Sequence, residues 1–171
     1  MQIDVARRTD VDRIVELVND AYRGTSRAPG WTHETHLIAG ARIGAAAVNE
    51  MIQPERSTIL VMRQDGVIVA CVALERLDDC EWYLSMLAVD PGHQTSGAGK
   101  SIMAGAERFA RERGAERMKI SVINLRESLI AWYERQGYVR TGAVAAFPND
   151  PTVGTPLRHD LALITLAKPL A

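Results

Sequence analysis

The feature that most constrains this chain is a strand, a glycine-containing loop, a helix and a second strand that follow one another between residues 80 and 124. The apolar run CEWYLSMLAV predicts a strand at 80–89, which Asp90-Pro91-Gly92 closes. The loop GHQTSGAGKS then opens a helix that ends at Gly114, before the strand MKISVIN at 118–124. A helix that connects two strands of one sheet requires them to be parallel. We therefore expect a β-α-β crossover with a right-handed connection.

Before and after this unit, predicted strands follow one another with only short connections. Such strands pair antiparallel, so together with the parallel pair they indicate a mixed sheet. STILVMRQ and VIVACVALERL, on either side of Asp65-Gly66, predict a hairpin. The other predicted elements are strands at 2–6, 138–147 and 160–168, and helices at 10–23, within 33–52 and at 126–136. We predict an α/β fold class, with a mixed α+β sheet of about seven mostly antiparallel strands flanked by about four helices. We expect one domain over residues 1–171.

Composition narrows the classes of function. The 171 residues are 47% hydrophobic, which supports a sizeable core, and carry a formal net charge of −1. Near-neutral charge lacks the basic footprint of a protein that binds nucleic acid or an anionic membrane. No apolar run reaches transmembrane length, and the charged start MQIDVARRTDVDR does not fit a secretory signal, so we expect a cytoplasmic location. Cys71 and Cys80 form no disulfide framework and lack further zinc ligands nearby, so we expect no metal.

The loop after the 80–89 strand admits two interpretations. A triphosphatase phosphate loop reads G-x-x-x-x-G-K-[ST], but Gln94 stands where its first glycine belongs. That class also needs a magnesium-binding aspartate at the end of a neighbouring strand, where this chain has Asn124. The other interpretation is a loop that holds the pyrophosphate of an acyl-coenzyme A on backbone N–H groups at a helix N-terminus. We favour the second interpretation.

Residues 94–99 spell Q-x-x-G-x-G, which resembles the [QR]-x-x-G-x-[GA] signature of the GNAT superfamily of N-acetyltransferases. The whole stretch 84–142, from the strand ending L-A-V-D-P to the closing W-Y-E-R-Q-G-Y, is similar to that family's cofactor-binding core. The elements before and after it also fall in the family's order. The resemblance implies the GNAT acyl-CoA N-acyltransferase fold and acetyl-CoA as a co-substrate. It is specific for fold and cofactor and nearly silent on the acceptor.

The resemblance also assigns residues to the cofactor. The main chain of one strand would hold the pantetheine arm, the loop would hold the pyrophosphate, and a strand-end asparagine would bind the cofactor's amide groups. A bulge near Met86 or Leu87 would free a backbone N–H for the thioester oxygen. For Lys100 a solvated side chain, and for Asn124 a turn-forming one, remain open alternatives. The implied cofactor-binding residues are Leu87, Ala88, Val89, Gln94, Thr95, Ser96, Gly97, Ala98, Gly99, Lys100 and Asn124.

Two residues are candidates for proton transfer. Tyr133 stands where the family carries a general-acid tyrosine, and a phenol can protonate a departing thiolate. Its spacing from Leu129 and Trp132 also fits a simple core stripe. Glu81, on the same strand face as Tyr83, is the candidate general base. An exposed edge carboxylate is the alternative for Glu81, in which case a water chain ended by backbone carbonyls would accept the proton.

The acceptor is expected between residues 24–36 and the loop at 146–160, where we predict Trp31, Glu34, Phe147 and Arg158 as substrate-binding residues. An aromatic wall beside carboxylates suits a cationic amine, whereas Arg27, Arg42 and Arg158 suit a substrate carboxylate, and the sequence leaves both open. We expect transfer to a primary amine of a small metabolite, amino acid or peptide. A non-catalytic acetyl-CoA sensor or interaction module is the alternative. A homodimer, common in the family, is a candidate assembly.

Overall fold

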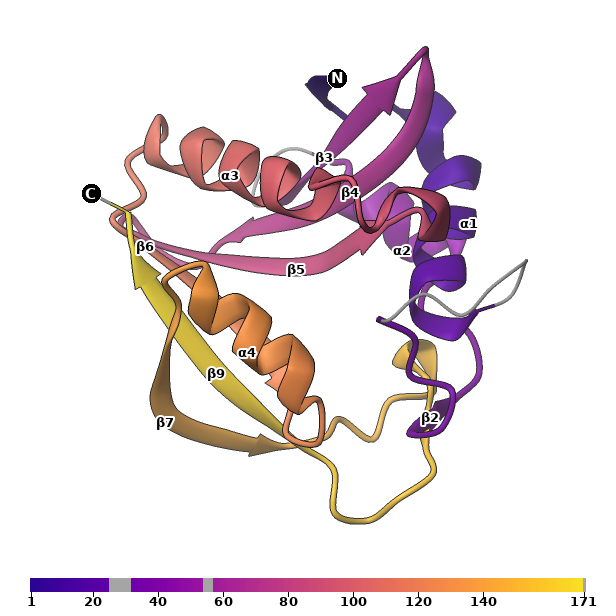
Figure 1. Cartoon of the computed structure of the whole chain (residues 1–171), viewed down its shortest axis with the longest axis vertical. Coiled ribbons are helices and arrows are strands. Elements are labelled where there is room, and N and C mark those ends of the chain that lie inside the picture. Colours follow the sequence, from indigo (N-terminus) through magenta and orange to yellow (C-terminus); the bar gives the residue numbers. More distant parts are fainter. Residues whose placement is uncertain (25–31, 54–56, 171) are drawn as a thin grey trace.

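The computed structural model describes residues 1–24, 32–53 and 57–170, and a seven-stranded sheet lies at its centre (Figure 1). The spatial order of the strands is β1-β3-β4-β5-β6-β9-β7. They span Gln2–Val5 (β1), Ser57–Gln64 (β3), Val67–Arg76 (β4), Glu81–Val89 (β5), Arg117–Ile123 (β6), Val139–Ala146 (β7) and Ala162–Pro169 (β9). Within the described residues, β5 and β6 form the one parallel pair of this sheet. The predicted mixed sheet is therefore confirmed.

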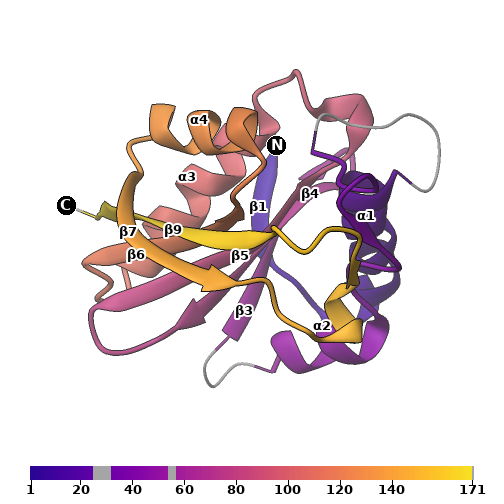
Figure 2. The same cartoon turned by 90° about the horizontal axis from the view of Figure 1, so that it is seen from below.

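Helices cover both faces of the sheet. Helices α1 (Val11–Arg23) and α2 (Ala45–Met51) lie on one face, and α3 (Ala98–Arg111) and α4 (Glu127–Arg135) lie on the other (Figures 1 and 2). The central residues of strand β4 are apolar because both faces of the strand are buried. Val72 packs in the same hydrophobic cluster as Ile102 of α3, whereas Cys71 packs in the cluster of Ile14 of α1 on the other face. No helix in the described ranges combines the length and the apolar character needed to cross a membrane.

A small second sheet joins the chain just after residues 24–36 to the 146–160 loop, and the acceptor was expected between these two segments. Strand β2 (Ile38–Ala39) pairs antiparallel with β8 (Thr155–Pro156). The prediction of helix within 33–52 is correct only for α2, because residues before it bond elsewhere. Leu157 N donates to Leu37 O, and Gly40 adopts a left-handed φ of +87° that a helix excludes. The described ranges also contain short 3₁₀ turns at Arg8–Asp10, Pro91–His93 and Pro151–Val153.

Two irregularities in β5 set the position of the site. Strands β5 and β6 pair only between Glu81–Tyr83 and Arg117–Lys119, and beyond these residues they separate. On the other side of β5, the register with β4 shifts between Cys71 and Ala73, and Met86 adopts a φ of +54°. A positive φ at a long side chain is rare and marks a strained bulge. The bulge expected near Met86 or Leu87 is therefore present, at the point where the sheet opens.

Candidate functional site

Two adjoining cavities lie where β5 and β6 separate. The first, of about 170 Å³, lies between these strands, the end of α1 and the loop after β7, and we call it the splay cavity. The second, of about 100 Å³, lies between the end of β5, the start of α3 and α4, and we call it the loop cavity. Tyr22, Leu129 and Tyr133 line both cavities. Two molecules bound from opposite sides would therefore meet at these three side chains.

The loop cavity ends at the N-terminus of α3. Gly97 precedes the helix with a left-handed φ of +80°, and Gly99, Lys100 and Gln94 also line the cavity. A β-carbon on Gly99 would lie 3.5 Å from Val89 Cγ2 and 3.7 Å from Trp132 Cζ2, so glycine keeps this passage open. The first N–H groups of a helix have no intrahelical acceptor and attract anions. The arrangement is suited to a phosphate-bearing ligand whose apolar part runs along β5.

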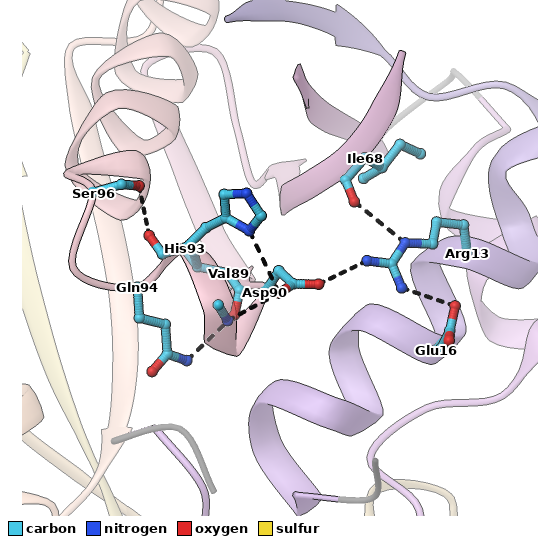
Figure 3. A network of polar contacts seen from close by, with 9 residues as sticks. Arg13, Glu16, Ile68, Val89, Asp90, His93, Gln94 and Ser96 are labelled. Atoms are coloured by element: carbon cyan, nitrogen blue, oxygen red, sulfur yellow. Dashed lines mark hydrogen bonds and ion pairs between the residues drawn. The ribbon is translucent and has the colours of Figure 1, made fainter. Parts of the chain in front are cut away.

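A polar network holds this loop against α1 (Figure 3). Asp90 accepts from Arg13 Nη2 at 2.9 Å and from Gly92 N at 3.0 Å. Burial alone raises the pKa of Asp90, but these hydrogen bonds outweigh it and lower the pKa below its ordinary value. Gln94 turns its amide back to Val89 O, at 3.3 Å. Its side chain therefore braces the loop, and the groups of the loop cavity suited to an anion are backbone N–H groups at the start of α3 and the side chain of Lys100.

Tyr133 lies at the junction of the cavities. It is 6% exposed, and its ring packs edge-on against those of Trp132 and Tyr138, with centroids 5.0 and 5.9 Å away. Burial raises the pKa of the Tyr133 phenol above its ordinary value, so the hydroxyl keeps its proton at neutral pH. The core-stripe and functional interpretations of this residue are therefore compatible, because its ring packs against other aromatic rings while the residue also lines both cavities.

Tyr22 is a residue of the site that the sequence did not single out. Its hydroxyl donates to Leu87 O at 2.8 Å, which ties the end of α1 to β5 beside the bulge. Burial raises the pKa of Tyr22 to about 12, so this hydroxyl also stays a donor. In the sequence Tyr22 continues the apolar face of α1, and no local signal distinguishes it from a core residue.

Glu34 lies at the edge of the splay cavity, but both of its oxygens are engaged. Arg23 Nη1 lies 2.8 Å from one oxygen and Arg126 Nη1 lies 2.8 Å from the other. The three side chains are 8% exposed or less. We call Arg23, Glu34 and Arg126 the buried triad. The carboxylate of Glu34 is therefore engaged by the two arginines, and no local sequence pattern indicates these partners.

Glu81, expected to act as general base, lies outside the lining of both cavities. Its carboxylate pairs with Lys119 Nζ at 2.5 Å and with Arg117 Nη1 at 3.6 Å. These partners come from β6, opposite the start of β5, where the two strands still pair. The geometry favours the alternative of a structural edge carboxylate.

Asn124 and Arg158 are also engaged elsewhere. The side chain of Asn124 accepts from Ala162 N at 3.0 Å and donates to Asp160 O at 3.1 Å, so it joins β6 to β9. Arg158 forms an exposed two-point pair with Asp160, at 2.8 and 2.6 Å. Neither residue lines the splay cavity or the loop cavity. The turn-forming interpretation of Asn124 and a surface role for Arg158 fit the structure best.

The other predicted residues divide between the cavities and their surroundings. Phe147 lines the splay cavity, and Leu87 and Val89 line the loop cavity. Ala88 packs in the core on the α1 side, and Ala98, the first residue of α3, packs in the core on the opposite side of the sheet. Thr95 and Ser96 are exposed in the loop. Trp31 and Arg27 lie outside the described residues. In the described ranges, no three His, Cys, Asp or Glu side chains are grouped so as to hold a metal ion.

Comparisons with known proteins agree with this geometry. Among the relatives, an uncharacterised N-acetyltransferase of Mycobacterium bovis is 30% identical over 102 residues, which cover 60% of this chain and 65% of that protein. An amino-acid acetyltransferase of Mannheimia succiniciproducens is 24% identical over 123 residues, 71% of this chain but 27% of that protein. The match thus spans less than two thirds of either relative.

A solved structure shares the fold over the whole chain. It is yncA, a putative acetyltransferase from Salmonella typhimurium with its cofactor acetyl-CoA, with a TM-score of 0.70 and 23% identity, covering 100% of this chain and 94% of that one. The model of the acetyltransferase (GNAT) family matches residues 11–138. This range contains strands β3 to β6, helices α1 to α4 and the loop that connects β5 to α3. This chain therefore belongs to the acetyltransferase (GNAT) family.

Proposed function

We propose that this protein transfers an acetyl group from acetyl-CoA to a primary amine of a small metabolite, an amino acid or a peptide. The observation that carries the proposal is the pair of cavities that meet at Tyr133, next to a strand bulge and in line with an open helix N-terminus. The names of the N-acetyltransferase relatives and the acetyl-CoA of the Salmonella structure support the same chemistry.

In this proposal acetyl-CoA occupies the loop cavity. Its pyrophosphate accepts hydrogen bonds from backbone N–H groups of residues 94–99, next to Lys100. Its pantetheine arm runs along Leu87 and Val89, whose strand has no β6 partner at these positions. Unpaired main-chain groups of β5 are then available to the amides of the arm.

The reaction is a direct attack within a ternary complex. The acceptor nitrogen, reaching through the splay cavity, forms a bond to the thioester carbon, and the carbon–sulfur bond breaks. A backbone N–H freed by the bulge at Met86 stabilises the oxyanion. Tyr133 donates its proton to the departing thiolate and regains one from solvent. The acceptor nitrogen loses one ammonium proton before attack and a second as the amide forms, so that with the thiol protonated one proton is released overall.

A water chain ended by backbone carbonyls is the proposed route for the acceptor's proton. The described carboxylate in the lining of the splay cavity is that of Glu34, and it is held between two arginines. Glu81 is held by Lys119 outside the cavity. Backbone carbonyls of β5 are available as acceptors in this region. Leu87 O, for example, accepts a hydrogen bond from the Tyr22 hydroxyl.

The test combines binding and turnover. Acetyl-CoA is titrated calorimetrically, with ATP and magnesium as the parallel ligand, and thiol release is then followed with a panel of primary amines. We expect binding of acetyl-CoA without binding of ATP, and amine-dependent thiol release. Binding without transfer to any amine would instead identify a non-catalytic acetyl-CoA sensor. Binding of ATP alone would refute the assignment of the loop.

A further inference from the structure

We propose that the acceptor carries a carboxylate or another anionic group, and that Arg42 binds it. The inference rests on the proposed acetyl transfer and names the class of acceptor that the splay cavity takes. Arg42 lies between β2 and α2, is half-buried, and lines this cavity together with Tyr22. Its guanidinium carbon lies 5.4 Å from the centre of the Tyr22 ring.

The charges around the splay cavity leave Arg42 without a counter-ion. The charged residues of its described lining are Arg23, Glu34 and Arg42. Arg23 and Arg126 together enclose Glu34, so the buried triad itself carries a net positive charge. No ion pair of the described chain involves Arg42, whose guanidinium contacts the Tyr22 ring instead. An unpaired arginine in a cavity is suited to a planar anion, which it binds through two parallel hydrogen bonds.

The position of Arg42 relative to the bulge explains how one molecule would reach both. Arg42 N donates to Asn19 Oδ1 at 2.7 Å, which fixes its backbone against α1. Tyr22, under the guanidinium, is itself bonded to Leu87 O beside the bulge at Met86. Tyr22 therefore lies between the two ends of the proposed acceptor. The anionic group binds at Arg42, and the amine lies on the far side of the tyrosine ring.

The same charges disfavour polycationic acceptors. A second ammonium group in the splay cavity would lie near the positive buried triad and Arg42, with the carboxylate of Glu34 already occupied. Like charges at such distances repel, more strongly where water is excluded. A carboxylate on the acceptor instead offsets the excess charge. Between the two interpretations that the sequence left open, the structure favours the substrate carboxylate and selects Arg42 for it.

The experiment compares ω-aminocarboxylates of increasing length with the carboxamides of the same length. For the best carboxylate we expect kcat/KM at least about tenfold above that of its carboxamide. Arg42→Gln should lower kcat/KM for the carboxylate by about 10- to 100-fold, mainly through KM, and change the value for the carboxamide by less than about threefold. Arg42→Lys should restore part of the difference. Arg76→Gln, an exposed arginine paired with Asp79, is the matched control.

A second readout separates this inference from acetyl transfer itself. The same compounds are titrated calorimetrically into the protein loaded with coenzyme A, which requires no turnover. Weaker carboxylate binding by Arg42→Gln, with carboxamide binding unchanged, would support the anion site even in a protein that does not acetylate. Equal binding of carboxylates and carboxamides, no binding of any carboxylate in the series, or equal loss of both in Arg42→Gln would overturn it.

Discussion

At the scale of single residues, the site depends on side chains whose polar atoms are already bonded to other groups of the protein. Tyr22 is bonded to β5, Asp90 holds the loop, and Glu34 is shared by two arginines. Tyr133 differs because it lines two cavities and keeps its phenol protonated. This contrast separates residues that position the site from the one proposed to transfer a proton.

Replacement of Tyr133 by phenylalanine tests the proposed acid. We expect Tyr133→Phe to lower kcat by about 100- to 10,000-fold under chemistry-limited conditions, the usual range for loss of a general acid, with the Kd for acetyl-CoA within about threefold. The matched control is Tyr138→Phe, in the same ring cluster, whose hydroxyl bonds to Glu107. Full turnover by Tyr133→Phe would show that another group protonates the thiolate.

Replacement of Glu34 by glutamine tests the buried triad. Glu34→Gln removes the carboxylate that pairs with the buried Arg23 and Arg126, so we expect the free energy of unfolding to fall by about 3–5 kcal/mol in chemical denaturation. Glu81→Gln is the control, because its partners are more exposed, and we expect a loss below about 1 kcal/mol in the free energy of unfolding.

The same variant tests the general base. We expect Glu81→Gln to keep the kcat of the parent protein, and a kcat lowered by tenfold or more would restore Glu81 as the base.

At the scale of elements, short local signals predicted most of the sheet and helices. The Asp65-Gly66 turn, the apolar period of α1 and the glycine after α3 each act within a few residues, and the corresponding elements formed as predicted. The segment before α2 was mispredicted because Leu37 and Gly40 bond to the 151–157 loop and to Arg23, far away in the chain. Such partners outweigh local helix propensity.

The start of α3 offers a test of the loop as a cofactor site. Gly99→Val would fill the space between Val89 and Trp132, and overpacking of about 1–3 kcal/mol should raise the Kd for acetyl-CoA by about tenfold or more. Gly44→Val, at the N-cap of α2 with open space around it, is the control and should leave the Kd unchanged. Calorimetric titration measures both, and an unchanged Kd in Gly99→Val would place the ligand elsewhere.

At the scale of the whole molecule, buried tyrosines link stability to alkaline pH. The pKa of Tyr22 is raised to about 12, against about 10 in the unfolded chain, and burial also raises the pKa values of Tyr133 and Tyr138. Between these values the unfolded state has lost a proton that the native state still holds. The contribution of the protonated Tyr22 to the free energy of unfolding is therefore complete below pH 10 and decreases as pH rises toward 12.

We accordingly expect the free energy of unfolding to fall between about pH 10 and pH 12, with a smaller slope in Tyr22→Phe than in the parent protein. Chemical denaturation at several pH values provides both slopes. Comparing slopes removes the constant loss of the Tyr22–Leu87 hydrogen bond from the comparison. Identical slopes would mean that Tyr22 ionises in the native state near its ordinary pKa.

The sequence by itself determined the order of the elements, the mixed sheet and the Q-x-x-G-x-G loop, because turns, periodicity and glycine spacing act over a few neighbouring residues. Only the tertiary structure decided which polar side chains face the cavities. Arg126 reaches Glu34 across 92 positions and Tyr22 reaches Leu87 across 65, so no local pattern contains these partners. Glu81 is a further case. Its position on the face of a strand suggested a general base, but in the folded protein its carboxylate pairs with a lysine of the neighbouring strand. A charged or hydrogen-bonding side chain acts through whatever lies a few ångströms away, and folding alone brings those groups together.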